Sequence, residues 1–138
     1  MLSRSFLGKE AKYQIMNQSQ AFRNGEGDAW FFRNKKHLET AAQSDIPLAL
    51  IAEGIPPLDA TSIVMEIGAS NGWRLAALHD RYGCNGIGVD ISSAAVLDGR
   101  NHWPYLELII ASAKDSAGIS QWLSTPPDLV IVYFVCHW

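Results

Sequence analysis

The sequence predicts an α/β fold in which a mostly parallel sheet is covered by helices on both faces. Three observations lead to this prediction. From residue 62 onward, short apolar runs alternate with segments of helical periodicity. A glycine-rich turn at 68–72 separates the first apolar run from the first helical segment, and the second apolar run ends in the acid Asp90. Strand, glycine turn, helix, strand and acid, in this order, are typical of the nucleotide-binding βαβ unit of a doubly wound, Rossmann-like fold.

Four strands and three helices are expected in this part of the chain. The strands are the apolar runs at 62–67, 86–90, 106–111 and 129–135. The helices are expected at 72–82, from an N-cap at Ser92 or Ser93 to about residue 100, and near 117–123. We expect the strands to lie in the order three, two, one, four.

The first helix of this unit has a distinct apolar side. Leu75, Leu78 and Tyr82 are spaced three and four residues apart and should pack on the sheet. Arg74, His79 and Arg81 fall largely on other sides, so we expect His79 to be a solvated helix residue rather than a catalyst.

The N-terminal part has a different character, and we expect residues 1–61 to form a helical cover on a cofactor-binding core at 62–138. A cluster of turn-forming residues at 24–28 divides this cover. Helical segments are expected at 8–22 and 35–43, with Pro47 as an interruption and a short turn at 48–52.

Composition limits the classes of protein that fit. A chain of 138 residues with 48% hydrophobic residues fits one folded domain, and a net charge of −3 gives no reason to expect nucleic acid or an anionic membrane as a partner. No apolar run reaches the roughly 20 residues of a spanning helix, and no signal-peptide core follows Met1. Cys84 and Cys136 are expected to be buried free thiols rather than a disulfide or a pair of metal ligands, in a cytoplasmic protein.

The fourth strand raises a separate question, because the segment LVIVYFV at 129–135 is apolar at every position. Such a strand should be covered on both faces and lie inside a sheet. The sequence continues for only three residues beyond it, to Trp138. Because an apolar edge strand is an aggregation hazard, we expect something to pair with it or cover it. A shortened, C-terminally incomplete core is the first interpretation, and a homodimer or another partner at this edge is the second.

S-adenosylmethionine is the first ligand that fits the glycine turn. Its sites have an acid in strand one before a turn of the form ExGxxxG, and Glu66, Gly68 and Gly72 have this spacing. Gly68 lets the backbone turn close to a ligand, where a Cβ would intervene. Gly72 lets the helix begin close to the sheet, and the N–H groups of the turn offer donors. Asp90 could then accept hydrogen bonds from both ribose hydroxyls.

Two other chemistries compete for the same turn. A nicotinamide dinucleotide site of the form GxGxxG needs a glycine where Ser70 stands. The turn also matches the G-x-S-x-G nucleophile elbow of hydrolases, with His137 downstream as a candidate base. An elbow, however, normally follows several strands and an oxyanion loop, and it would leave Glu66 and Asp90 without a role.

Three segments together resemble the class I S-adenosylmethionine-dependent methyltransferases. They are MEIGASNGWRLAAL at 65–78, GIGVDIS at 86–92 and PDLVIVYFVCHW at 127–138. The resemblance is greatest to small-molecule enzymes associated with polysaccharide and sugar biosynthesis, including those linked to pseudaminic acid. These enzymes commonly carry a WFxRN element upstream, which corresponds here to WFFRN at 30–34. The resemblance covers about residues 22–138.

The resemblance implies a place for each part of the cofactor. Its methionine part would be surrounded by the turn and the acid before it, namely Glu66, Gly68, Ala69, Ser70 and Gly72. Asp90 would hold the ribose and Ile91 would lie against the adenine. Ser112 and Ala113 would approach the adenine edge, at a place where many relatives carry an acid that this chain lacks.

The resemblance also implies residues that cover the cofactor and a general base that acts on the substrate. Arg33 would reach the cofactor carboxylate as the N-terminal segment folds over the site, and Trp30 or Phe31 would shield it. His137 would act as a general base on a sugar hydroxyl. Each has a structural alternative: the aromatic residues as core, Arg33 as a surface residue, and His137 as a packed or solvated side chain.

The leading functional prediction is therefore methyl transfer from S-adenosylmethionine to a small-molecule substrate, a sugar or sugar derivative being the class that the resemblance implies. The prediction from another class is a non-catalytic module that binds cofactor or depends on a partner. No metal is expected in either case.

Overall fold

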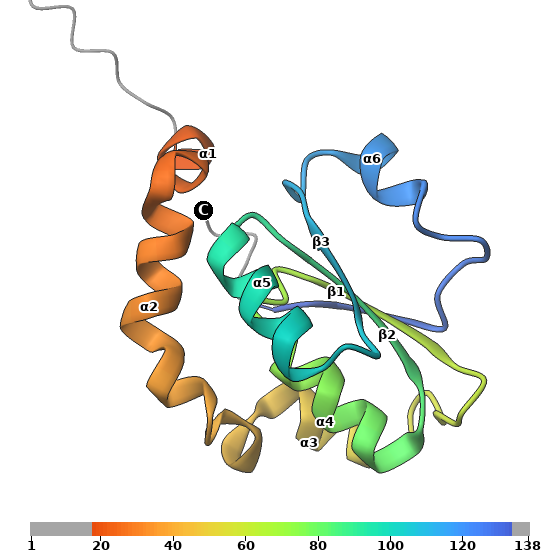
Figure 1. The fold of residues 1–138 in the computed structure, drawn as a ribbon. Coiled ribbons are helices and arrows are strands. Elements are labelled where there is room, and N and C mark those ends of the chain that lie inside the picture. Colours follow the sequence, from red (N-terminus) through yellow and green to blue (C-terminus); the bar gives the residue numbers. More distant parts are fainter. Residues whose placement is uncertain (1–17, 134–138) are drawn as a thin grey trace, which may run out of the picture.

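The computed structural model describes residues 18–133, and it has the predicted parallel sheet (Figure 1). Its strands are β1 (Ile63–Ile67), β2 (Asn85–Asp90), β3 (Glu107–Ile110) and β4 (Leu129–Val132). All neighbouring pairs are parallel, and the order is β3-β2-β1-β4. The predicted Rossmann-like fold class and strand order are therefore confirmed.

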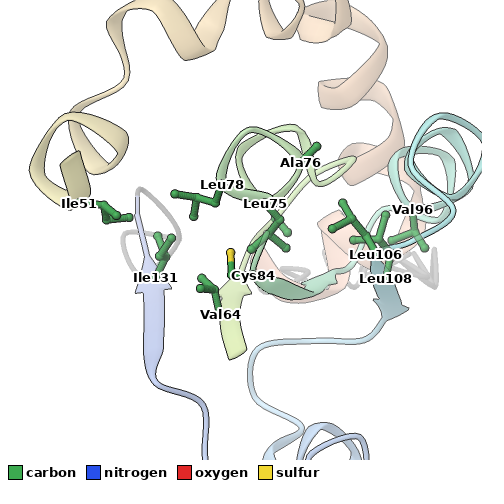
Figure 2. Packing of buried hydrophobic residues seen from close by; sticks show 11 residues of the cluster. Ile51, Val64, Leu75, Ala76, Leu78, Cys84, Val96, Leu106, Leu108 and Ile131 are labelled. Atoms are coloured by element: carbon green, nitrogen blue, oxygen red, sulfur yellow. The ribbon is translucent and has the colours of Figure 1, made fainter. Parts of the chain in front are cut away.

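Helices lie against both faces of this sheet. The helices α4 (Trp73–Tyr82) and α5 (Ser93–His102) follow β1 and β2, and their apolar residues form one core with the sheet (Figure 2). Leu75 and Leu78 are fully buried in this core, as their spacing predicts. On the opposite face, the short helix α6 (Ser116–Ser120) contributes Ile119 to a second, smaller core.

The N-terminal segment runs along the helical layer rather than over the sheet itself. It consists of α1 (Gln18–Ala21), a kinked π-helical turn η1 (Phe22–Glu26), α2 (Gly27–Leu38), the 3₁₀ turn η2 (Ala41–Ser44) and α3 (Ile46–Ala52). The long helix α2 lies beside α5 (Figure 1). Within residues 18–133, no helix is long and apolar enough to cross a membrane.

The start of α2 is the largest error in the sequence-based assignment. We expected a helix at 35–43, whereas the structure begins it at Gly27 and ends it at Leu38. The chain does kink at Gly25, where φ is 116°, but the helix begins only two residues later. Tertiary contacts explain the difference, because Asp28 and Lys35, two turns apart on the helix, bond to the N-terminus and the middle of α5. Residues 8–17 of the predicted first helix lie outside the described residues.

Pro47 starts a helix instead of interrupting one. Asp45 caps α3 by accepting a hydrogen bond from Leu48 N at 3.0 Å, and Pro47 occupies the first turn. A proline costs nothing there, since the N–H that it lacks would have no partner within the helix. The sequence pattern had placed this proline at the end of the preceding helix.

Strand β4 forms one edge of the described sheet, because it pairs with β1 alone among the described strands. Its side chains alternate: Ile131 is buried in the larger core, whereas Val130 and Val132 are 50% and 48% exposed on the other face. The prediction that a partner or further chain covers this strand stays a prediction, as does the division at residues 61 and 62. Residues 134 and 135 of the predicted strand lie outside the described part of the chain.

Candidate functional site

The glycine turn folds back onto the end of β2. Gly68 N and Ala69 N both donate to Val89 O, at 2.7 and 3.0 Å. Gly68 has a φ of 76°, in the left-handed region that favours glycine. The turn is thus pinned to the last residues of the neighbouring strand.

Asp90 is the residue that this arrangement brings to the turn. Its Oδ2 accepts a hydrogen bond from Ser70 N at 2.7 Å, and its Oδ1 accepts one from Ser92 N at 2.8 Å. Burial raises the pKa of Asp90 above its ordinary value, although both backbone N–H groups oppose this shift. Each carboxylate oxygen has a further lone pair, so Asp90 can still accept hydrogen bonds from a ligand.

Two buried polar atoms at the turn have no hydrogen-bond partner among the described residues: Glu66 Oε2 and Ser70 Oγ. Ser70 also has a φ of 54°, which is uncommon for a residue with a side chain. Buried polar groups are normally satisfied, and exceptions concentrate at functional sites. These two atoms are therefore candidate contacts for the polar groups of a ligand.

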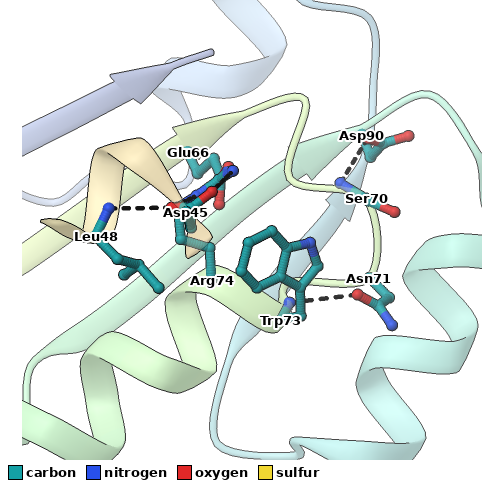
Figure 3. A network of polar contacts seen from close by, with 8 residues as sticks. All are labelled: Asp45, Leu48, Glu66, Ser70, Asn71, Trp73, Arg74 and Asp90. Carbon is teal, nitrogen blue, oxygen red and sulfur yellow. Dashed lines mark hydrogen bonds and ion pairs between the residues drawn. The ribbon is translucent and has the colours of Figure 1, made fainter. Parts of the chain in front are cut away.

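Glu66 belongs to a buried ionic network (Figure 3). Arg74 Nη1 donates to Glu66 Oε1, while Nε and Nη2 of Arg74 donate to Asp45 at 2.9 and 2.8 Å. Burial raises the pKa of Glu66 to about 7, and the attraction of Arg74 opposes this shift only in part. The network connects β1 and α4 to the residue that begins α3.

Arg74 is the site residue that sequence reasoning missed. Helical periodicity places it away from the side of α4 that packs on the sheet, but the side chain is buried. The covering residues come from the N-terminal segment, whose path the periodicity of α4 cannot reveal. A signal was present, since an acid before Pro47 predicts an N-cap, yet nothing local indicates that this acid also binds Arg74.

A second polar connection joins α2, α5 and the turn. Asp98 accepts hydrogen bonds from Lys35 Nζ at 2.6 Å and from Asn71 Nδ2 at 3.0 Å. Hydrogen bonding to Lys35 and Asn71 lowers the pKa of Asp98, despite the opposing effect of burial. Gly99, the next residue of α5, has no room for a side chain, since a Cβ there would lie 2.0 Å from Asn71 O.

A third connection lies at the N-terminus of α5. Asp28 of α2 accepts hydrogen bonds from Ser92 Oγ at 2.6 Å and Ala94 N at 3.0 Å, which lowers its pKa. Ser92, rather than Ser93, is the N-cap of α5, because its Oγ accepts from Ala95 N. The N-terminal segment thus reaches residues beside Asp90, Ser70 and Glu66.

The remaining predicted cofactor residues lie around the same strand ends. Ala111 N donates to Asp90 O, so the residues after β3 lie beside those after β2. Ile91 and Ser112 are half-buried there, whereas Ala113 is exposed. Gly72 precedes α4 with a φ of 84°, and a Cβ on it would press on Leu108.

Among the described residues, no hydrogen bond or ion pair joins the predicted cover residues to the turn. Arg33 lies exposed on α2 and pairs with Glu26 at 2.5 Å. Trp30 lies on the same helix and is partly exposed, while Phe31 is core. The roles of Arg33 and Trp30 at a cofactor stay predictions, and His137 lies outside the described residues.

The hydrolase interpretation gains no support from the described histidines. None of them hydrogen-bonds to Ser70 Oγ, which has no hydrogen-bond partner within residues 18–133. His79 Nδ1 bonds to Cys84 O, and His102 Nδ1 bonds to Asp98 O. Over residues 18–133, no group of three or more His, Cys, Asp or Glu side chains is arranged to hold a metal ion.

Comparison with known proteins gives matches in structure alone. No family model matches the sequence, and no curated protein matches it. Among solved structures, a S-adenosylmethionine-dependent methyltransferase from Thiobacillus denitrificans, in complex with S-adenosylhomocysteine, matches 67% of this chain with a TM-score of 0.53 and 18% identity. An RNA methyltransferase from Salinibacter ruber, also in complex with S-adenosylhomocysteine, matches 67% with a TM-score of 0.52 and 16% identity. DesVI of Streptomyces venezuelae matches 78% with a TM-score of 0.50 and 17% identity.

These matches define the class of fold. It is the Rossmann-like fold that the two methyltransferases in complex with S-adenosylhomocysteine have. This chain shares it over two thirds or more of its length, but spans only 38%, 60% and 41% of the three proteins in the order given. At these identities the likeness establishes the fold, and function has to be argued from the site.

Proposed function

We propose that this chain binds S-adenosylmethionine and serves methyl transfer to a small metabolite, a sugar or sugar derivative being the acceptor class that its sequence resemblance suggests. One observation carries the proposal: Asp90, at the end of β2, is fixed by Ser70 N of the glycine turn, and the buried acceptors Ser70 Oγ in this turn and Glu66 Oε2 in β1 before it have no partner among the described residues. The two fold neighbours that are complexes with S-adenosylhomocysteine support it.

The residues fit the polar parts of this cofactor. Glu66 Oε2 and Ser70 Oγ can each accept a hydrogen bond, as an ammonium group requires, and Asp90 retains acceptor capacity for ribose hydroxyls. In this proposal the cofactor contacts come from Trp30, Arg33, Glu66, Gly68, Ala69, Ser70, Gly72, Asp90, Ile91, Ser112 and Ala113. Trp30 and Arg33 would have to approach the turn from their positions on α2.

The protein has little covalent chemistry to perform in such a reaction. The cofactor supplies an activated methyl group, so the protein aligns acceptor and donor and excludes water. Removal of a proton from an oxygen or nitrogen acceptor is the task that we assign to His137. Residues of the N-terminal segment and the end of β4 would select the acceptor.

A non-catalytic, partner-dependent module is the second candidate. Val130 and Val132 favour it, because they leave an apolar strip half exposed at the edge strand β4. This candidate predicts cofactor binding without turnover by the isolated chain, or no binding until a partner is present.

Calorimetric titration with S-adenosylhomocysteine tests the proposal. We expect the wild-type chain to bind, and Asp90→Ala to weaken binding by about 1–3 kcal/mol, because hydrogen bonds to a charged group are lost. Asp115→Ala is the matched control, since Asp115 also accepts a backbone N–H but caps α6 on the other face of the sheet. No heat at millimolar ligand would refute cofactor binding by this chain, and equal affinity of the Asp90 variant would refute the ribose assignment. Labelling of Ser70 by a fluorophosphonate would point to a hydrolase instead.

A further inference from the structure

Two buried carboxylates share a single guanidinium beneath the glycine turn. The side chains of Asp45, Arg74 and Glu66 are 6%, 9% and 1% exposed. Asp45 takes two N–H donors of Arg74, and Glu66 takes one through Oε1. With both acids ionised, the three residues carry a net charge of −1, and Glu66 Oε2 has no donor among residues 18–133.

The other described charged groups around Glu66 do not supply a second positive charge. Arg74 of α4 attracts it, whereas Asp45 before α3 and Asp90 of β2 repel it. The rings of Trp73 and Tyr133 lie 4.6 and 5.5 Å from the Arg74 guanidinium. Glu66 is therefore a buried carboxylate whose negative charge is balanced only in part by the guanidinium that it shares with Asp45. A proton or a cationic ligand can balance the rest of this charge.

We propose that Arg74 is a positioning residue of the cofactor site, and that Asp45 controls through it how strongly Glu66 attracts a cationic ligand. Arg74 fixes Oε1 of Glu66 and leaves Oε2 free to accept. Asp45 belongs to the N-terminal segment. When that segment is docked, Asp45 competes with Glu66 for the guanidinium of Arg74 and so weakens the attraction between Arg74 and Glu66. This inference rests on the proposed function and adds a regulation of the same site.

Competition between proton and ligand follows from this arrangement. The pKa of Glu66 is about 7, and only the ionised carboxylate attracts the ammonium group of the cofactor. Affinity for S-adenosylhomocysteine should therefore rise about tenfold from pH 6 to pH 8, which is the change in ionised fraction around such a midpoint. Glu66→Gln should remove this dependence.

Asp45→Asn is the decisive variant. Asparagine still caps α3 but has no charge, so the removal of a neighbouring anion should lower the Glu66 midpoint. A fall of about one pH unit would reduce the affinity ratio between pH 8 and pH 6 to about twofold. Asp115→Asn is the matched control, an identical change at the N-cap of α6, and it should keep the wild-type ratio.

Carbon-13 NMR of the glutamate carboxyl groups in the free protein measures the titration midpoint of Glu66 without any ligand. The Glu66 signal, assigned by its loss in Glu66→Gln, should titrate at a lower pH in Asp45→Asn than in wild type. Arg74→Lys, which cannot reproduce the forked contacts to both acids, should move it to higher pH. An unchanged midpoint in these variants, with affinity reduced equally at both pH values, would show a merely structural role and overturn the inference. Absence of binding by wild type at both pH values, with the predicted NMR shifts, would refute the proposed function but not the control of Glu66 by Asp45 and Arg74.

Discussion

Gly99→Ala should lower the free energy of unfolding by about 3 kcal/mol, within the range for inserting atoms where no space exists. The added Cβ would lie 2.0 Å from Asn71 O and 2.8 Å from Asn71 C, both backbone atoms of the glycine turn. A flexible side chain could move aside, but the backbone of the turn is held by the hydrogen bonds of Ala69 N to Val89 O and of Ser70 N to Asp90. The sign is informative, because the same substitution at an open helical position stabilises a helix by up to about 1 kcal/mol.

Urea denaturation followed by circular dichroism measures this effect. Asn101→Ala, at an exposed position of the same helix, is the matched control and should change stability by less than about 0.5 kcal/mol. We also expect Gly99→Ala to weaken S-adenosylhomocysteine binding, since displaced Asn71 adjoins Ser70. A Gly99 variant as stable as wild type would show that α5 and the turn are not packed as described.

Arg74→Met should destabilise the protein by about 3–5 kcal/mol at pH 8, the usual result of removing one partner from a buried ion pair. Two carboxylates would lose their shared cation in a site where the Glu66 side chain is 1% exposed. Methionine keeps much of the volume of the arginine stem, so loss of charge rather than a cavity dominates.

The destabilisation caused by Arg74→Met should be smaller at low pH. Because burial raises the pKa of Glu66 from 4.5 to about 7, the folded state holds a proton there that the unfolded state has released. This contribution to stability is fully present below about pH 4.5 and is lost as the pH rises through about 7. Without Arg74 the proton is held to still higher pH, so the deficit of the variant should be greater at pH 8 than at pH 5.5. Arg81→Met, at an exposed position of α4, is the control and should show little effect at either pH. A deficit independent of pH would mean that Glu66 does not change its charge in this range.

Local sequence patterns were sufficient to predict the strands of the sheet, the glycine turn and the N-cap of α5. Period and composition predicted the start of each of the four strands within one residue, because strands of a parallel sheet read as apolar runs. Even β4 has this pattern, although Val130 and Val132 are half exposed. The contact of Ser70 with Asp90 also follows from local order, since parallel strand ends meet at one edge of the sheet. Ser92 was one of the two predicted caps for α5.

The N-terminal segment could not be predicted in the same way. Helix α2 begins at Gly27 because Asp28 and Lys35 find partners on α5, more than 60 residues further along the chain. Residues 27 and 28 have weak helix propensity by themselves, and tertiary contacts outweigh that preference. Arg74 was misplaced for the same reason, because its burial depends on Asp45 of the segment that covers it.

By itself, then, the sequence determined the Rossmann-like unit of this protein, its glycine turn and the acid that meets it, since these depend on residues close in sequence or on strands with a strong apolar pattern. Only the tertiary structure decided how the turn is supported. Gly99 beneath Asn71, Lys35 at Asp98, and Asp45 with Arg74 at Glu66 all join separate elements. The ionisation of Glu66 is the clearest example of a property that the tertiary structure decides. It depends on the burial of the carboxylate and on the sharing of Arg74 with Asp45, and these residues come from separate stretches of the sequence.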